Sequence, residues 1–336
     1  MARYRLEEIL GEGAEGTTYR ATRLEDELEV AIKELPLRRA VEPQTLELLR
    51  REARTLRQLQ HPAIPRYLDD FVAGEGKTRA LFIVQEYING RTLADELVDH
   101  HHGEDDVLRI LEELLVILGY MHALEPPVLH RDLKPGNVMR RGSDGRLMLV
   151  DFGLARDILK DSDVGATTVA GTFGYMAPEQ LRGASGSGTE LYGLGALAVA
   201  LLSRRRPHTL LDHAYRMRWQ DRVDVSGPMA GLLADLLHRD PEQRESSADR
   251  VLARVRALRG VSAAGEAIDA DPHEETMLMP AVAEDGDTTV PPWAVGPGAL
   301  GTPSPGPAHR RRVQVWLVLA IAMAVAAAVV VALALT

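Results

Sequence analysis

The sequence predicts an α+β protein whose folded part is followed by a flexible segment and a membrane-spanning helix. Apolar and polar residues alternate with period 2 in residues 28–35, which indicates a strand. Apolar residues recur at helical spacing in residues 42–60, which indicates a packed helix. Residues 315–335 are almost wholly apolar, and as a helix they would span about 30 Å, the thickness of a bilayer core.

The composition excludes several classes of protein. The chain has 336 residues, no cysteine and a formal net charge of -10. Without cysteine there are no disulfides, thiolate zinc sites or cysteine nucleophiles. Binding to a nucleic-acid backbone needs clustered Lys and Arg, and the only basic tract that stands out is residues 310–312. We therefore expect no nucleic-acid partner.

The chain is predicted to divide into a folded domain at 1–260, a linker at 261–309 and a transmembrane helix at 313–335. The linker is acidic, rich in Ala, Gly and Pro, and lacks Lys and Arg, so it cannot bury enough apolar surface to fold. Arg310, Arg311 and Arg312 precede the helix, which predicts a cytoplasmic N-terminal side and a single-pass membrane protein. The Arg, Ala and Gly bias is typical of a GC-rich bacterium. The apolar segment 191–202 is too short to span, so we interpret it as a core helix.

A glycine-rich turn lies between two predicted strands at 4–10 and 17–23. Gly11, Gly13 and Gly16 have the spacing that lets backbone amides approach phosphates. The motif is weak alone, because glycine-rich hairpins are common. A strand on both sides, with no helix following, favours a nucleotide-binding hairpin over a dinucleotide fold.

A lysine and a glutamate are candidate partners near this turn. Lys33 is one of few lysines in an arginine-rich chain, and a compact ammonium suits α- and β-phosphates. Glu52 borders the apolar face of the 42–60 helix, where a carboxylate needs a partner such as Lys33. A solvated strand lysine and an exposed helix glutamate are the alternatives.

The most specific signal is the loop LHRDLKPGNVM, followed by a strand-like RLMLV and then DFG. It contains Asp132, Lys134, Asn137 and Asp151. Phosphoryl transfer needs a carboxylate that accepts the hydroxyl proton, oxygen ligands for a metal ion and a cation for the developing charge. These four residues supply that set, which predicts a transferase that uses ATP and Mg²⁺ (or Mn²⁺).

In this order and spacing, the motifs resemble the eukaryotic-like, or Hanks-type, protein kinases over about residues 4–258, most closely the bacterial membrane-bound serine/threonine kinases. The resemblance implies a bilobal fold, with a β-rich N-lobe at about 1–88 and a helical C-lobe at about 89–260. It also implies that Glu86 and Ile88 offer backbone groups to adenine, that Gln85 is the gatekeeper and that Ala31 packs on the base.

The resemblance further assigns roles to the polar residues. Lys33 would hold the α- and β-phosphates and pair with Glu52. Asp132 would be the catalytic base, Lys134 would neutralise the γ-phosphate, and Asn137 and Asp151 would bind the metal. Thr172 in GTFGYMAPE would bond near Asp132, and Glu179 would pair structurally with Arg244.

Two residues depart from the family pattern. Thr18 replaces a valine that usually packs on adenine, which should cost ATP affinity because a polar group faces an apolar surface. Glu190 replaces an aspartate that usually holds the catalytic-loop backbone, and its extra methylene must be absorbed in a packed site.

Regulation and partners are also predicted. Thr167 and Thr168 are candidate autophosphorylation sites whose phosphate would pair with Arg131. The linker residues Thr276, Thr288 and Thr289 could recruit a phosphothreonine-binding partner. Protein substrates are expected, and the family makes a homodimer for trans-phosphorylation plausible.

Three further interpretations of the sequence are less favoured. A pseudokinase scaffold is disfavoured by the complete catalytic set, and a small-molecule phosphotransferase by the full segment from DFG to APE. The run His100 to His102 suggests a metal site, but a solvated loop at a helix end is favoured because no second ligand cluster accompanies it in the sequence.

Overall fold

The computed structural model describes residues 3–13, 16–37, 53, 55–153 and 173–269. The predictions for Glu52, for the threonines at 167, 168 and 172, and for the transmembrane helix at 313–335 lie outside these residues. So does the linker, apart from its first nine residues. Among the described residues, no helix is long and apolar enough to cross a bilayer.

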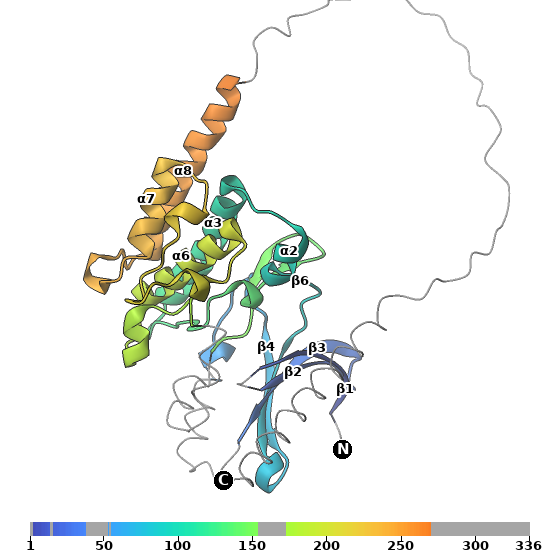
Figure 1. Cartoon of the computed structure of the whole chain (residues 1–336). Helices are drawn as coiled ribbons and strands as arrows, with labels where there is room; N and C mark the ends of the chain where they lie inside the picture. Colours follow the sequence, from blue (N-terminus) through green and yellow to red (C-terminus); the bar gives the residue numbers. More distant parts are fainter. Residues whose placement is uncertain (1–2, 14–15, 38–52, 54, 154–172, 270–336) are drawn as a thin grey trace, which may run out of the picture. The chain divides into compact units, whose positions relative to one another are not determined.

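The N-terminal part is a five-stranded antiparallel sheet of order β1-β2-β3-β5-β4. Its strands, blue to cyan in Figure 1, are β1 (Tyr4–Glu12), β2 (Thr17–Arg23), β3 (Leu28–Pro36), β4 (Tyr67–Ala73) and β5 (Ala80–Glu86). The predicted strands at 4–10, 17–23 and 28–35 are therefore confirmed. A short 3₁₀ turn, Gly76–Thr78, joins β4 to β5.

The alternation in β3 gives the sheet two different faces. Val30 and Ile32 are buried in one apolar cluster with Ala21 and Val84. Leu35, which shares its face with Ala31 and Lys33, is buried in another cluster together with Ala53. The face that carries Lys33 is thus the face covered by the chain at Ala53.

The C-terminal part is mainly helical, and its helices run from teal to orange in Figure 1. They are α2 (Leu93–Asp99), α3 (Glu104–His122), α6 (Ser187–Ser203), α7 (Gly227–Leu236) and α8 (Ala248–Asp269). A small sheet of order β6-β7-β8 (Gly90–Thr92, Val138–Arg141 and Leu147–Leu149) lies among them. Short 3₁₀ segments occupy Pro135–Asn137, Pro178–Arg182, Pro207–Leu210, Gln220–Arg222 and Pro241–Gln243.

The helical core is built around α6. This helix is buried almost all round, from Thr189 to Leu202, and packs in one large cluster with α3, α7 and the start of α8. The prediction of a buried core helix at 191–202 is therefore confirmed, and so is the bilobal α+β architecture.

Helix α8 continues past residue 260, where the sequence placed the end of the folded domain. It continues to Asp269, nine residues beyond the expected end of the domain at 260. The added segment contains Ala263, Ala264, Glu266 and Ala267, which are residues of high intrinsic helix propensity, so a helix that is already nucleated can extend through it.

Candidate active site

A cavity of about 630 Å³ opens between the five-stranded sheet and the helical part. This volume lies in the usual range for small-molecule sites. The lining includes many of the residues predicted from sequence: Gly11, Gly13, Gly16, Thr18, Ala31, Lys33, Gln85, Glu86, Ile88, Asp132, Lys134 and Asp151. Residues separated by more than 100 positions in the chain thus meet at one site.

The glycine-rich turn between β1 and β2 requires glycine at one position. Gly16 has φ of 152°, and a side chain there would collide with the backbone carbonyl of Glu34 on β3. Its carbonyl accepts a 2.9 Å hydrogen bond from the Gly13 amide. Gly11 and Gly13 also line the cavity; a side chain on Gly11 would meet no atom within 4 Å, and one on Gly13 would meet only the Gly16 carbonyl oxygen at 4.0 Å.

Lys33 and Asp151 form an ion pair across the cavity. The Lys33 ammonium lies 3.1 Å from Asp151 Oδ1. Burial would raise the pKa of Asp151, but the ammonium of Lys33, through its charge and its hydrogen bond, and secondarily the charge of Lys134 outweigh it and hold that pKa below its ordinary value. Asp151 is therefore an ionised carboxylate at neutral pH.

The loop 130–137 contains a second lysine–carboxylate pair, formed by Lys134 and Asp132. Lys134 Nζ donates a 2.7 Å hydrogen bond to Asp132 Oδ2. Asn137 Nδ2 donates to the same oxygen at 3.0 Å and to the Asp132 carbonyl at 2.8 Å. These bonds fix the Asp132 carboxylate at the cavity wall, while Asn137 is buried and does not line the cavity.

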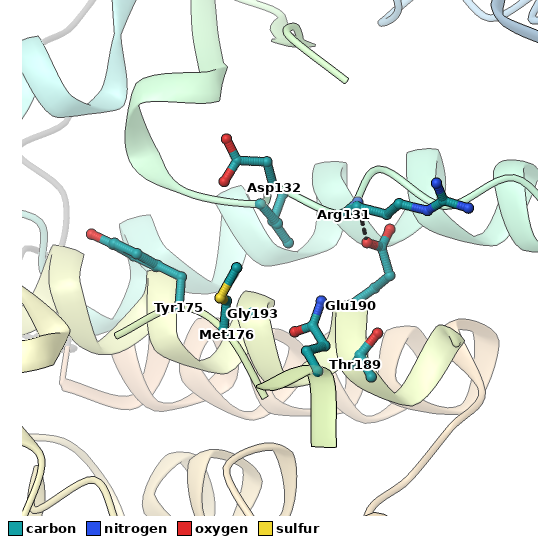
Figure 2. A pocket seen from close by; sticks show the side chains of 9 residues that line it. Arg131, Asp132, Tyr175, Met176, Thr189, Glu190 and Gly193 are labelled. Atoms are coloured by element: carbon teal, nitrogen blue, oxygen red, sulfur yellow. Dashed lines mark hydrogen bonds between the residues drawn. The ribbon is translucent and has the colours of Figure 1, made fainter. Parts of the chain in front are cut away.

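Glu190 on α6 holds the backbone of this loop from beneath. Its Oε2 accepts a 2.9 Å hydrogen bond from the amide of His130, and its Oε1 accepts a 2.7 Å bond from the amide of Arg131. Figure 2 shows the carboxylate reaching up to Arg131 while the Asp132 side chain points away from it. The extra methylene of glutamate is thus accommodated with both bonds intact.

The Glu190 carboxylate, which anchors the loop, is ionised although it is buried. Burial would raise the pKa of Glu190, but the imidazole of His122 and the contacts with His130 and Arg131 lower it below the ordinary value. His122 Nε2 lies 3.9 Å from Glu190 Oε2. Two backbone donors therefore face a negative charge, which strengthens both bonds.

His130 was not singled out from the sequence, yet it connects three parts of the site. Its Nε2 lies 2.9 Å from the carbonyl of Val150, its own carbonyl accepts from the Gly153 amide, and its ring packs 4.7 Å from that of Phe152. Burial lowers the pKa of His130, so the ring is neutral. Its position directly before Arg131 and Asp132 was the available sequence signal.

Two residues of the site have left-handed backbone conformations. The φ angles of Arg131 and Asp151 are 64° and 63°. Such angles cost non-glycine residues about 1–3 kcal/mol and are found at functional sites, where surrounding contacts impose them. Here the hydrogen bond to Glu190 holds Arg131, and the ion pair with Lys33 holds Asp151.

The segment after β5 borders the other end of the cavity. The Glu86 side chain forms an ion pair with Arg66, whose Nε lies 3.2 Å from its Oε2. Ile88 is buried, and Gln85 and Thr18 line the wall with Ala31. Thr92 and Asp95 also line the cavity, and no local motif indicated them.

The ion pair expected away from the cavity is present. Arg244 Nη1 donates a 2.6 Å hydrogen bond to Glu179 Oε1, and the arginine side chain is fully buried. Arg244 also donates to the carbonyls of His238 and Gly188. The pair ties the Pro178–Arg182 segment to the region before α8.

The donor set suits a divalent metal ion. Asp151 presents an ionised carboxylate to the cavity. Asn137 is buried behind it, with its Nδ2 3.5 Å from the Asp151 carbonyl, and would supply an amide oxygen if that group turned toward a bound ion. Hard oxygen donors of these two kinds are the ligands that Mg²⁺ takes.

Comparison with known proteins agrees with this geometry. The protein kinase domain matches residues 4–254. Serine/threonine-protein kinase B from Synechocystis sp. is 32% identical over 273 residues, covering 74% of this chain and 46% of that protein. Serine/threonine-protein kinase C of the same organism is 32% identical over 262 residues, covering 73% of this chain and 48% of that protein.

A third relative comes from another bacterium. Serine/threonine-protein kinase pkn3 from Myxococcus xanthus is 30% identical over 277 residues, covering 76% of this chain and 50% of that protein. The chain spans about half the length of these curated relatives. It belongs to the Hanks-type protein kinase family, whose members use ATP with a divalent metal ion.

Proposed function

We propose that this protein is a serine/threonine kinase that transfers the γ-phosphate of ATP to hydroxyl groups of protein substrates. The observation that carries the proposal is the convergence of Asp132, Lys134 and Asp151 on one cavity that is also lined by the glycine-rich turn. The bacterial relatives, all named serine/threonine kinases, support the choice of substrate class.

In the proposed reaction, the oxygen of a serine or threonine attacks the γ-phosphorus, the bond to the β-phosphate oxygen breaks, and ADP leaves. Asp132 accepts the hydroxyl proton, and the Lys134 ammonium, 2.7 Å from it, is near enough to stabilise charge on the transferring group. Mg²⁺ (or Mn²⁺), held by Asp151 and Asn137, would neutralise charge on the β- and γ-phosphates.

We assign nucleotide binding to the side of the cavity that is formed by the five-stranded sheet and the segment after β5. The backbone of Gly11, Gly13 and Gly16 covers the phosphates, and Lys33 holds the α- and β-phosphates while Glu52 orients its ammonium. The adenine lies between Ala31 and the backbone of Glu86 and Ile88. Each of these residues except Glu52, which is outside the described part of the chain, lines the cavity.

The Glu190 geometry bears on the alternative of a pseudokinase scaffold. The sequence argument for loss of activity rested on Glu190 and Thr18, and Glu190 retains both bonds to the loop. We therefore favour catalysis over a scaffold.

Control of the enzyme is proposed from the remaining sequence features. Phosphorylated Thr167 or Thr168 pairs with Arg131, and Thr172 bonds near Asp132, which orders the peptide site. The 313–335 helix anchors the kinase domain on the cytoplasmic side of the membrane. Dimerisation permits trans-phosphorylation, and phosphorylated linker threonines recruit a phosphothreonine-binding partner.

The test uses the full chain, purified in detergent, with labelled ATP and Mg²⁺, beside Asp132→Asn. Label on serine or threonine that is lost in the variant supports the proposal. Absence of label in the wild-type protein, with ATP still bound in an equilibrium assay, would replace the proposed kinase by a scaffold. Phosphopeptide mapping of labelled protein then tests Thr167 and Thr168.

A further inference from the structure

Three metal-ligating side chains meet where α2 ends and α3 begins. His100 caps α2, His102 lies in the short turn, and Asp106 is in the first turn of α3. One donor atom from each residue lies within 4.8 Å of the others. Figure 1 shows this turn joining α2 to α3. The sequence favoured a solvated loop because no second ligand cluster accompanies the histidines, and the fold brings the single carboxylate of Asp106 beside them.

The buried member of the cluster has an unsatisfied nitrogen. The His102 side chain is 2% exposed, and among the described residues its Nε2 has no hydrogen-bond partner. Glu96 is the nearest carboxylate, at 3.9 Å, but both of its oxygens are bound by Arg140. A buried polar atom without a partner is unfavourable, and coordination of a cation would satisfy it.

The carboxylate of Asp106 faces His100 across the turn. Asp106 offers a second donor through Oδ2, because Arg109 occupies Oδ1 at 3.0 Å. Oδ2 lies 3.9 Å from His100 Nε2.

We propose that His100, His102 and Asp106 form a Zn²⁺ site that ties the end of α2 to the start of α3. Two imidazoles and one carboxylate are borderline donors that zinc binds with a water as fourth ligand. Tetrahedral zinc ligands lie about 3.3 Å apart, from metal–ligand distances of about 2.0–2.1 Å. His100 and Asp106 are 56% and 42% exposed, so these two side chains can close on the buried His102.

The site would act on the kinase cavity through α2. Thr92 and Asp95, at the start of α2, line the cavity, and Arg204 Nη2 donates to the carbonyls of Leu97 and Val98 near the end of that helix. A metal bound at His100 therefore adds a further attachment to a short helix of seven residues. The direct consequence is a higher unfolding temperature for the metal-bound protein.

Binding is measured on the full chain in detergent, without a histidine tag or nucleotide, by competition between a chromophoric chelator and Zn²⁺ alone. One equivalent of Zn²⁺ is expected, with a rise of a few degrees in Tm. His100→Ala and Asp106→Asn should each weaken binding by about tenfold or more and abolish the rise in Tm. His101→Ala, the adjacent exposed histidine outside the cluster, should bind like the wild type. Co²⁺ in place of Zn²⁺ should give a tetrahedral visible spectrum that His100→Ala loses.

A further variant distinguishes zinc bound at the cluster from zinc bound in the kinase cavity. Asp151→Asn should leave Zn²⁺ binding unchanged, because the cluster is independent of the phosphate-binding region. The proposal is overturned if the wild type binds no Zn²⁺, if His101→Ala loses binding as His100→Ala does, or if Asp151→Asn abolishes it. None of these results bears on phosphate transfer, which the Asp132→Asn comparison tests separately.

Discussion

The Glu190 carboxylate accepts a 2.7 Å hydrogen bond from the amide of Arg131, the residue directly before Asp132. With the parallel bond from the His130 amide, it fixes the backbone from which the proposed catalytic base projects. The helix that supplies this glutamate is buried from Thr189 to Leu202, so the anchor is part of the helical core.

Glu190→Gln should destabilise the fold and slow phosphate transfer. An amide has one acceptor oxygen, so one of the two loop amides would face an NH₂ group and remain unpaired, at a cost of about 1–3 kcal/mol. Urea denaturation measures the loss of unfolding free energy, and labelled-ATP incorporation measures the activity. Glu242→Gln, at an exposed glutamate, is the matched control and should change neither. Equal stability of the two variants would contradict the proposed anchor.

Arg244→Ala should cost about 3–5 kcal/mol of unfolding free energy, because it leaves the Glu179 carboxylate without its buried partner. Arg218→Ala breaks an exposed pair with Asp212 and should cost less than about 1 kcal/mol. Denaturant titrations of both variants provide the comparison. A loss from Arg244→Ala no larger than that from Arg218→Ala would show that the buried pair is dispensable.

Lys33→Met should raise the pKa of Asp151. In the wild type the folded pKa lies below the ordinary value of 3.8, so the stabilisation from the Lys33 pair is fully present above that pH and is lost as the pH falls through the folded pKa. Burial, which is already the largest single influence on this carboxyl group, would then act without the opposing ammonium of Lys33. NMR titration of a labelled Asp151 side chain in both proteins measures the shift, and an unchanged pKa would rule out Lys33 as its cause.

Gly16→Ala should disturb the glycine-rich turn. The alanine would have φ of 152° and a methyl group against the Glu34 carbonyl, a strain of about 1–3 kcal/mol. Thermal unfolding should show the loss, and ATP affinity should fall with it. Gly11→Ala, which has open space around it, should unfold at the wild-type temperature. If both variants unfolded alike, the turn would not depend on the conformation of Gly16.

Features that are encoded locally could be predicted from the amino-acid sequence alone. Alternation along β3 places Lys33 on the same face as Leu35. The apolar run in α6 predicts that this helix is buried. Both patterns involve residues only a few positions apart, so they can be recognised in the sequence. The order of Asp132, Lys134, Asn137 and Asp151 indicated the family, since their spacing follows from the chemistry of phosphate transfer.

Contacts between distant segments emerged only from the tertiary structure. The sequence raised a doubt about the extra methylene of Glu190, and only the depth at which α6 packs under the loop showed that both bonds form. The Lys33–Asp151 contact joins residues from the two lobes. Asp106 is close to His100 and His102 in the sequence too, but its meeting with them depends on the turn that starts α3 beside the end of α2. Such relationships depend on how elements pack, which local periodicity does not contain.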